Sequence, residues 1–485
     1  MIKRILVMAT ALLGCCVSSS GEPTDKPNVL FIAIDDLNDF VGCMNGSVSA
    51  PTPHIDRLAA QGTLFTNAHC QAPICGPSRA SIMTGLYPST TGNYVHVNDD
   101  KIKAGSAVAA QSIFMPDYFE QHGYKTMGVG KIYHNEDRAK TFDEYGGGFE
   151  WFGPRPAERI NYDPSKLPHK IGGTSTDWGV FPEHDWQMPD YKCAAWATEK
   201  LNQTHEKPFF LGVGFLRPHV PWYVPQKWFD KIQMDASMIP PFKADDLNDV
   251  PELGQRVADV PQMPTTEELI ADDGWLDVMH AYLASIAFVD AQIGKVLDAL
   301  EDSAYADNTV VVLWSDHGYH LGEKNRFAKM SLWERDSRVV LAFKAPGMAG
   351  NQVSPASVQL MDIYPTLLEL CGLPEYELAE GNSLVPLMHN PDRPWDHRAL
   401  VFYGEGNIAV RDERYRLIQY EDGSLELYDM SEDPNEWHNL AHDSSHQKIV
   451  ESLQQSIPHH WAPLNPESTY YDVNPYFAEK TAPLK

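Results

Sequence analysis

Four short apolar segments along the chain are each followed by a cluster of polar residues. The segments span residues 27–34, 125–129, 209–215 and 309–314. Their β-branched and aromatic composition, without polar alternation, predicts strands that are buried on both faces of a parallel sheet. Helical periodicity appears between them, most clearly over residues 281–300. Strands that alternate with helices predict a doubly wound, mostly parallel α/β sheet.

The polar clusters after these segments predict a ligand site. In chain order they are Asp35-Asp36, Gly130-Lys131, Arg217-Pro218-His219 and Ser315-Asp316-His317. In doubly wound sheets, ligands bind beyond the carboxyl ends of the strands. We therefore expect all four clusters to lie at the same edge of the sheet.

Three regions depart from the alternation of strands and helices. Residues 147–189 and 240–264 are rich in proline and polar residues and have no clear period, so we expect two surface insertions. After residue 394, short strands separated by turns predict a small antiparallel α+β subdomain. Its expected elements are strands at 408–411, 415–420 and 425–428 and a helix near 447–457. The prediction is a main domain over 27–394 and a C-terminal subdomain over 395–485.

The first residues have the pattern of an export signal. A basic start is followed by an apolar run over residues 5–13. That run is too short for a membrane span, which needs about 20 residues. We expect a signal peptide over 1–21 and an exported protein, either periplasmic, attached to the outer membrane or secreted. Residues 12–15 resemble a bacterial lipobox, so a lipid anchor on Cys15 and ordinary signal cleavage are both open.

The composition excludes several classes of protein. Of 485 residues, 43% are hydrophobic, enough for a large core, and the 36 scattered prolines exclude a coiled coil. Lys and Arg total 38 against 66 Asp and Glu, a net charge of -28. Such a surface repels polyanions and argues against a nucleic-acid partner, so an anionic substrate would need a local cationic pocket. Without the first sixteen residues, five cysteines remain, which are too few for a dense disulfide framework in a large exported protein.

Two pairs of polar residues predict a divalent metal site. Asp35-Asp36 and Asp316-His317 each end a predicted strand. Carboxylate oxygens are the ligands that a hard divalent cation prefers. Either pair alone is also typical of a surface turn, and their convergence at one edge is what favours a metal.

The segment over residues 74–85, Ile-Cys-Gly-Pro-Ser-Arg-Ala-Ser-Ile-Met-Thr-Gly, predicts a helix that begins near Cys75. Pro77 suits the first turn of a helix. A buried structural cysteine would account for Pro77 but gives no reason for Arg79. A thiol at a helix N-terminus lies beside free backbone N–H groups and the positive end of the helix dipole, a natural anion site.

The Cys-x-Pro-Ser-Arg sequence, followed by Thr-Gly, resembles the signature of the type I, formylglycine-dependent sulfatases. Further family motifs occur in family order: Asp35-Asp36, Gly130-Lys131 with His134, Arg217-Pro218-His219-Val220-Pro221, Ser315-Asp316-His317-Gly318 and Lys329. The resemblance runs from about residue 27 to 440. Many members have Asn at the position of His317, whereas the iduronate-2-sulfatase-like branch has His. In this respect the sequence resembles that branch.

The resemblance implies an alkaline-phosphatase-like fold and hydrolysis of sulfate esters in a polysaccharide or oligosaccharide. In this family a maturation enzyme oxidises the cysteine, here Cys75, to formylglycine (3-oxoalanine), whose hydrate is the nucleophile. The resemblance also implies Ca²⁺ held by Asp35, Asp36, Asp316, His317 and a Cys75-derived oxygen. Imidazole is an unusual ligand for a hard ion, so the assignment of His317 rests on the resemblance alone.

The resemblance further implies a role for each basic side chain. Arg79 would orient the formylglycine hydrate, and Lys131 and Lys329 would neutralise the sulfate oxygens. His219 would be the general acid that protonates the leaving sugar oxygen. His134 would assist removal of a proton from the second hydroxyl group.

Two other functions stay open on the sequence. The first is a phosphodiesterase or phosphonate hydrolase of the same superfold, which transition metals and additional His and Asp ligands would favour. The basic residues around one inferred calcium ion favour sulfate instead. A non-catalytic binder of sulfated glycans, with Cys75 unmodified, would use the same basic residues. The sugar is not identified: iduronate 2-sulfate in heparan or dermatan fits, and so do marine polysaccharides such as ulvan or carrageenan.

Overall fold

The structure of the chain is a computed structural model that describes residues 26–135, 141–148, 150, 152–166, 173–469 and 474–481. The expected signal peptide and the lipobox at Cys15 lie outside the described residues. Within them, no helix is both long and apolar enough to cross a membrane.

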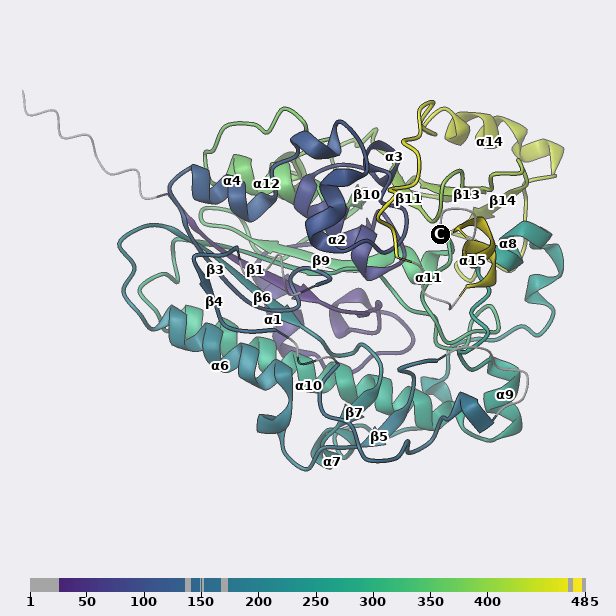
Figure 1. The fold of residues 1–485 in the computed structure, drawn as a ribbon, viewed down its shortest axis with the longest axis horizontal. Coiled ribbons are helices and arrows are strands. Elements are labelled where there is room, and N and C mark those ends of the chain that lie inside the picture. Colours follow the sequence, from purple (N-terminus) through teal and green to yellow (C-terminus); the bar gives the residue numbers. More distant parts are fainter. Residues whose placement is uncertain are drawn as a thin grey trace, which may run out of the picture.

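An eight-stranded sheet forms the centre of the molecule (Figure 1). Its strands, in spatial order, are β10 (Gln352–Gln359), β2 (Thr63–His69), β9 (Arg338–Lys344), β8 (Thr309–Ser315), β1 (Asn28–Ile34), β6 (Phe209–Phe215), β3 (Lys125–Gly130) and β4 (Glu144–Tyr145). Only β9 runs antiparallel to its neighbours β2 and β8; the other pairs are parallel. The predicted doubly wound, mostly parallel sheet is confirmed.

Helices cover both faces of this sheet, as Figure 1 shows. Alternate residues of β1 point to opposite faces: Val29, Phe31 and Ala33 join one apolar cluster, and Leu30 and Ile32 join another. The first cluster includes side chains of α2 (Cys75–Thr84), α4 (Met115–Gln121) and α12 (Ile363–Leu370). The second includes α1 (Pro53–Gln61), α6 (Pro189–Leu201) and α10 (Trp275–Glu301).

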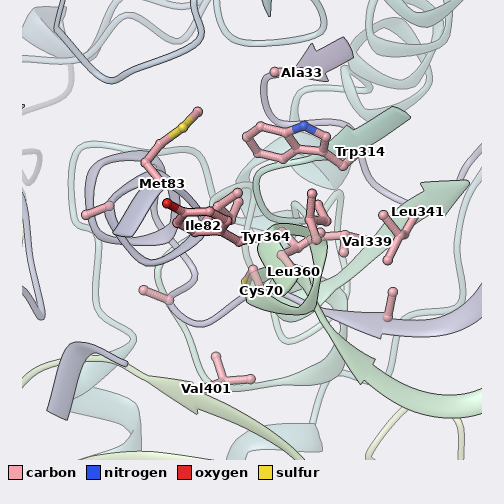
Figure 2. Packing of buried hydrophobic residues seen from close by; sticks show 14 of the residues in the cluster. Ala33, Cys70, Ile82, Met83, Trp314, Val339, Leu341, Leu360, Tyr364 and Val401 are labelled. Atoms are coloured by element: carbon pink, nitrogen blue, oxygen red, sulfur yellow. The ribbon is translucent and has the colours of Figure 1, made fainter. Parts of the chain in front are cut away.

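Helix α2 packs against the sheet, since its Ile82 and Met83 lie in the first cluster together with Trp314 of β8 (Figure 2). Every residue of α2 is buried. Buried apolar side chains of this size each stabilise the fold by about 1.5–3 kcal/mol. The N-terminus of α2 therefore has a fixed place relative to the strand ends.

A second, four-stranded antiparallel sheet follows the main one in sequence. It has the order β11 (Ala399–Phe402), β12 (Ile408–Arg411), β13 (Tyr415–Gln419) and β14 (Leu425–Asp429), and α14 (Gln447–Gln454) packs on it. This confirms the predicted antiparallel α+β region, whereas the domain boundary at residue 394 stays a prediction.

The remaining elements connect these layers. The helices are α3 (Pro88–Thr91), α7 (Gln226–Phe229), α8 (Glu252–Val257), α9 (Thr266–Ala271), α11 (Glu334–Ser337), α13 (Val385–His389) and α15 (Pro475–Thr481). In the first expected insertion, β5 (Trp178–Val180) pairs with β7 (Trp222–Val224), which ties the insertion to the chain after β6. The second insertion, 240–264, contains α8.

The strand register brings the polar clusters to one edge. Ile34 at the end of β1 pairs with Phe215 of β6 and Ser315 of β8, and Gly130 at the end of β3 pairs with Gly214. The residues that follow these strand ends must therefore lie side by side. The expectation of a shared edge is confirmed.

Candidate active site

Cys75 is the first residue of α2. The preceding Ile74 is extended, with φ −160° and ψ 142°, so the helix begins abruptly at Cys75, whose exposure is 2%. Pro77 has no N–H group, and none is needed in a first helical turn. The first turn of α2 contains no acidic residue. Its free N–H groups and the positive end of the dipole are therefore not neutralised by the helix itself.

Basic side chains surround the Cys75 sulfur. Lys329 Nζ lies 3.0 Å from Sγ and His317 Nε2 lies 3.2 Å from it. His134 is a further hydrogen-bonding partner. Burial alone would raise the pKa of the Cys75 thiol, but nearby cations, Lys131 and Lys329 first, lower that pKa well below its usual range. The site is built to hold negative charge at position 75.

The carboxylates at the end of β1 are paired with buried lysines. Lys131 Nζ donates a hydrogen bond to Asp35 Oδ2, and Lys329 Nζ donates to Asp36 Oδ1 at 2.6 Å. All four side chains are buried. A charge removed from water is costly unless it is paired. Burial alone would lower the pKa of both lysines, but the neighbouring carboxylates raise it, so both lysines stay charged.

Arg79 connects three parts of the site. Its Nε donates to Asp316 Oδ2 at 2.8 Å, and its Nη1 donates to the carbonyl oxygens of Lys131 and Ile132. Arg79 is fully buried and lies one turn after Cys75, so both side chains share a face of α2. Arg79 therefore locks the strand end after β8 and the chain after β3 to the helix that presents Cys75.

The backbone after β1 is held in a strained conformation. Asp36 has φ +60°, a left-handed value that non-glycine residues rarely adopt. Its N–H donates to Asp316 Oδ1 at 3.2 Å, and its carbonyl oxygen accepts from the Tyr282 hydroxyl at 2.8 Å. Such strain persists where the surrounding structure enforces it, and it is concentrated at functional sites.

Two buried carboxylate oxygens, Asp35 Oδ1 and Asp36 Oδ2, have no hydrogen-bond partner. His317 Nδ1 donates to the Gly318 carbonyl at 2.8 Å, which leaves Nε2 directed at Asp36 Oδ1, 3.3 Å away. Within the described residues, two overlapping groups have potential metal-ligating atoms within 4.8 Å of one another: Asp35, Cys75, Asp316 and His317, and Asp35, Asp36, Cys75 and His219. Orphaned carboxylate oxygens in such a cluster fit a divalent cation, so the residues present fit the expected calcium ion.

His219 faces the same carboxylates and lies against an aromatic ring. Its Nε2 is 3.9 Å from Asp36 Oδ2, and its Nδ1 donates to the Val220 carbonyl at 2.6 Å. The Phe152 ring stacks on the imidazole, with centroids 4.6 Å apart and an interplanar angle of 22°. Lys131 Nζ lies 5.7 Å from the centroid of the same ring. The first insertion thus contributes a wall of the site through Phe152.

His134, after β3, completes the predicted set. Burial lowers its pKa, and its hydrogen bond to Cys75 opposes that shift. The imidazole of His96 stacks on it, with centroids 4.1 Å apart and an interplanar angle of 26°. Neither His96 nor Phe152 belongs to a motif. Their only sequence signal is that they lie in loops outside the regular elements.

The structure brings all of the predicted catalytic and metal-binding residues into one cluster, and their individual roles stay predictions.

Cys70, Cys193 and Cys371 are buried, and none of the five cysteines within the described residues forms a disulfide.

The comparisons with known proteins decide the chemistry. A sequence model of the sulfatase family matches residues 27–373, and one described as the C-terminal part of N-sulphoglucosamine sulphohydrolase matches residues 322–461. The chain is 46% identical to a sulfatase of Formosa agariphila over 486 residues, covering 99% of this chain and 96% of the relative. The chain belongs to the sulfatase family.

This sulfatase is also similar to iduronate 2-sulfatase of Mus musculus, at 29% identity over 90% of this chain and 95% of that protein. The resemblance to the iduronate-2-sulfatase-like branch is thereby supported, and the enzyme is a sulfuric ester hydrolase.

Solved structures confirm the fold of the sulfatase. A 2-O GAG sulfatase matches with a TM-score of 0.66 at 22% identity, over 89% of this chain and 91% of that one. A phosphonate monoester hydrolase from Silicibacter pomeroyi matches with a TM-score of 0.67 at 21% identity, over 88% and 94%. Since both activities occur on this fold, the fold alone does not distinguish them, and the sequence relationships do.

Proposed function

We propose that this sulfatase is exported and removes sulfate from a sulfated glycan, with Cys75 matured to formylglycine and Ca²⁺ in the carboxylate cluster. One observation supports the proposal above all others. A buried cysteine at a helix N-terminus lies within 3.0–3.2 Å of a lysine and an imidazole, beside carboxylate oxygens that have no hydrogen-bond partner. A structural cysteine needs none of these neighbours.

Each absent group has a defined place in the proposal. The metal ligands would be Asp35, Asp36, Asp316, His317 and an oxygen at position 75, and the ion would act as a Lewis acid toward the sulfuryl oxygens. Formylglycine would supply a hydroxyl nucleophile in place of the thiol. A maturation enzyme must therefore be a partner of the newly made chain.

The lysines would bind the sulfate group. In the structure Lys131 and Lys329 neutralise Asp35 and Asp36. A divalent cation would take over the pairing of these carboxylates. Both ammonium groups would then be available for charge-assisted hydrogen bonds to the sulfate oxygens. Arg79 stays with Asp316, so its contribution is to orient the residue at position 75 and the metal ligand.

The two histidines would move protons. Because Nδ1 of His219 donates to the Val220 carbonyl, Nε2 is the ring nitrogen left to face the leaving sugar oxygen, and it would donate the proton from a ring that carries hydrogen on both nitrogens. Burial keeps the pKa of His134 below its usual range, so its imidazole is neutral and can accept a proton near position 75.

The names of two relatives support the choice of candidate substrates. Iduronate 2-sulfatase and the 2-O GAG sulfatase act, by their names, on 2-sulfated sugars, so sulfated uronic acids are the first candidates and marine galactans and ulvan the second. The test measures inorganic sulfate released from heparan, dermatan, ulvan and carrageenan oligosaccharides, with a phosphonate and a phosphodiester as comparisons. Sulfate release that Cys75→Ala abolishes, in a variant that still folds, supports the proposal. Turnover of the phosphorus substrates alone contradicts it, and saturable glycan binding without turnover would favour a binder.

A further inference from the structure

The segment that contains His96 contacts His134 and the next residue, Asn135. The first contact is the stack of the two imidazole rings, with centroids 4.1 Å apart. The second is a reciprocal pair of contacts: the Asp99 carboxylate accepts the Asn135 N–H, and the Asp99 N–H donates to Asn135 Oδ1 at 3.2 Å. The ring of His134 and the backbone next to it are thus held by one loop.

His96 also packs against the first turn of α2. A Cβ atom at Gly76 would lie 2.5 Å from His96 Nδ1, closer than real contacts allow. The imidazole of His96, which is 5% exposed, therefore fills the space between Gly76 and His134. Without it, the ring of His134 would lose the ring that stacks on it and gain room to rotate.

Residues 465–469, which we name the C-terminal strap, hold this loop from far along the chain. The Thr469 N–H donates to the His96 carbonyl at 2.7 Å, and Ser468 forms an antiparallel bridge with Val97. Asn465 Nδ2 donates to Asn93 Oδ1 at 2.7 Å, where both residues are buried. His96 and Thr469 are 373 residues apart in sequence.

We propose that His96 is a positioning residue that holds the imidazole of His134 toward residue 75, and that the C-terminal strap keeps His96 in place. The inference rests on the proposed function, in which His134 accepts a proton. It requires the aromatic ring of His96 but neither of its nitrogen atoms. The strap is then part of the active-site architecture, although it lies in the last 21 residues of a 485-residue chain.

The first test compares His96→Ala with His96→Phe, which keeps a ring at that position. We expect His96→Ala to lower kcat by about tenfold to a hundredfold, the effect of a misplaced catalytic group, with KM unchanged within about twofold. His96→Phe should restore most of kcat. Rates are divided by the fraction of Cys75 converted to formylglycine, because Gly76 adjoins Cys75. An unchanged kcat for His96→Ala overturns the inference, and so does a folded His96→Phe that is as slow as His96→Ala.

The second test changes the strap. Thr469→Pro removes the N–H that binds His96, and we expect kcat to fall in the same direction while the melting temperature changes little. Glu467→Ala is the matched control, an exposed side chain on the same strap. A Thr469→Pro enzyme with wild-type kcat overturns the role of the strap.

A third measurement does not depend on sulfatase activity, so it separates this inference from the proposed function. In protein labelled with ¹³C-histidine, the Hε1 signal of His134, assigned with His134→Asn, reports the ring current of its stacked neighbour. We expect His96→Ala to move that signal, and His96→Phe to move it less. An unmoved signal overturns the inference even if the enzyme releases sulfate. A moved signal in a protein that releases none supports the stack and counts against the function.

Discussion

The ammonium group of Lys329 lies 3.0 Å from the sulfur of Cys75, and the two residues are 254 positions apart in the chain. Lys329 Nζ also contacts Asp36 Oδ1 at 2.6 Å. One cation therefore links the residue that begins α2 to a carboxylate that follows β1. This arrangement suits a group that stabilises negative charge while a bond to residue 75 forms.

Lys329→Met should lower kcat by about 10²- to 10³-fold, the usual effect of removing one preorganised donor from a charge-stabilising site. The measurement is steady-state sulfate release. Lys344→Met, at the end of β9, is the matched control, because the Lys344 ammonium group donates to the surface side chain of Gln61 at 3.1 Å. Equal rates for wild type and Lys329→Met would remove Lys329 from the chemistry.

His219→Ala should affect substrates according to their leaving group. A sugar hydroxyl needs a proton as it leaves, so sugar sulfate hydrolysis should fall by about 10²- to 10⁴-fold. Nitrophenyl sulfate has a good leaving group and should lose far less. Comparing kcat/KM for the two substrates gives the answer directly. Losses of equal size would mean that His219 is not the general acid.

Removal of calcium should lower both activity and stability. An ion that binds only the folded state stabilises it by about 3 kcal/mol when present at a hundred times its Kd. Dialysis against a chelator should therefore lower the melting temperature and stop sulfate release, and added Ca²⁺ should restore both. A protein that is indifferent to the chelator in both measurements has no calcium site.

Glu334→Gln tests the ion pairs between α11, which contains Glu334, and the C-terminal sheet. Glu334 Oε2 lies 2.8 Å from Arg416 Nη2 and 3.1 Å from Arg411 Nε. Burial would raise the pKa of Glu334, but the two arginines lower it well below its ordinary value of 4.5. The folded state thus has the lower pKa, so the stabilisation is complete above about pH 5 and is lost as the pH falls below the unfolded value.

We expect Glu334→Gln to reduce the free energy of unfolding at pH 7 by about 3 kcal/mol, since it removes the carboxylate charge that pairs with both buried arginines. Urea unfolding between pH 7 and pH 4 should show that the difference in the free energy of unfolding between wild type and Glu334→Gln becomes smaller as the pH falls. Glu413→Gln, an exposed neighbour, is the control. A difference that stays constant over this range would show that the charge of Glu334 does not stabilise the fold.

The sequence predicted the centre of the fold because β1, β6 and β8 are unbroken apolar runs. Four strands of the same sheet were not predicted: β10, β2, β9 and the two-residue β4. β10 reads Gln-Val-Ser-Pro-Ala-Ser-Val-Gln, and a proline is tolerated there because β10 lies at the edge of the sheet. β2 and β9 begin or end with polar residues and pair antiparallel, which the local pattern does not reveal.

The site residues that belong to short sequence motifs were predictable. Cys75 and Arg79 share one helix turn, and Asp35 and Asp316 each follow a recognisable strand. His96 is different, because its role depends on a ring stack with His134 and on a hydrogen bond from Thr469, near the other end of the chain. Contacts between such distant residues leave no pattern in a single sequence.

The most direct test of the account follows sulfate release against the modification of Cys75. Preparations made with increasing amounts of maturation enzyme are digested with trypsin, and mass spectrometry of the peptide over residues 58–79 gives the fraction in which the thiol has become an aldehyde. We expect a rate of sulfate release proportional to that fraction, with none at zero conversion. Full activity in protein whose Cys75 is unmodified would contradict it.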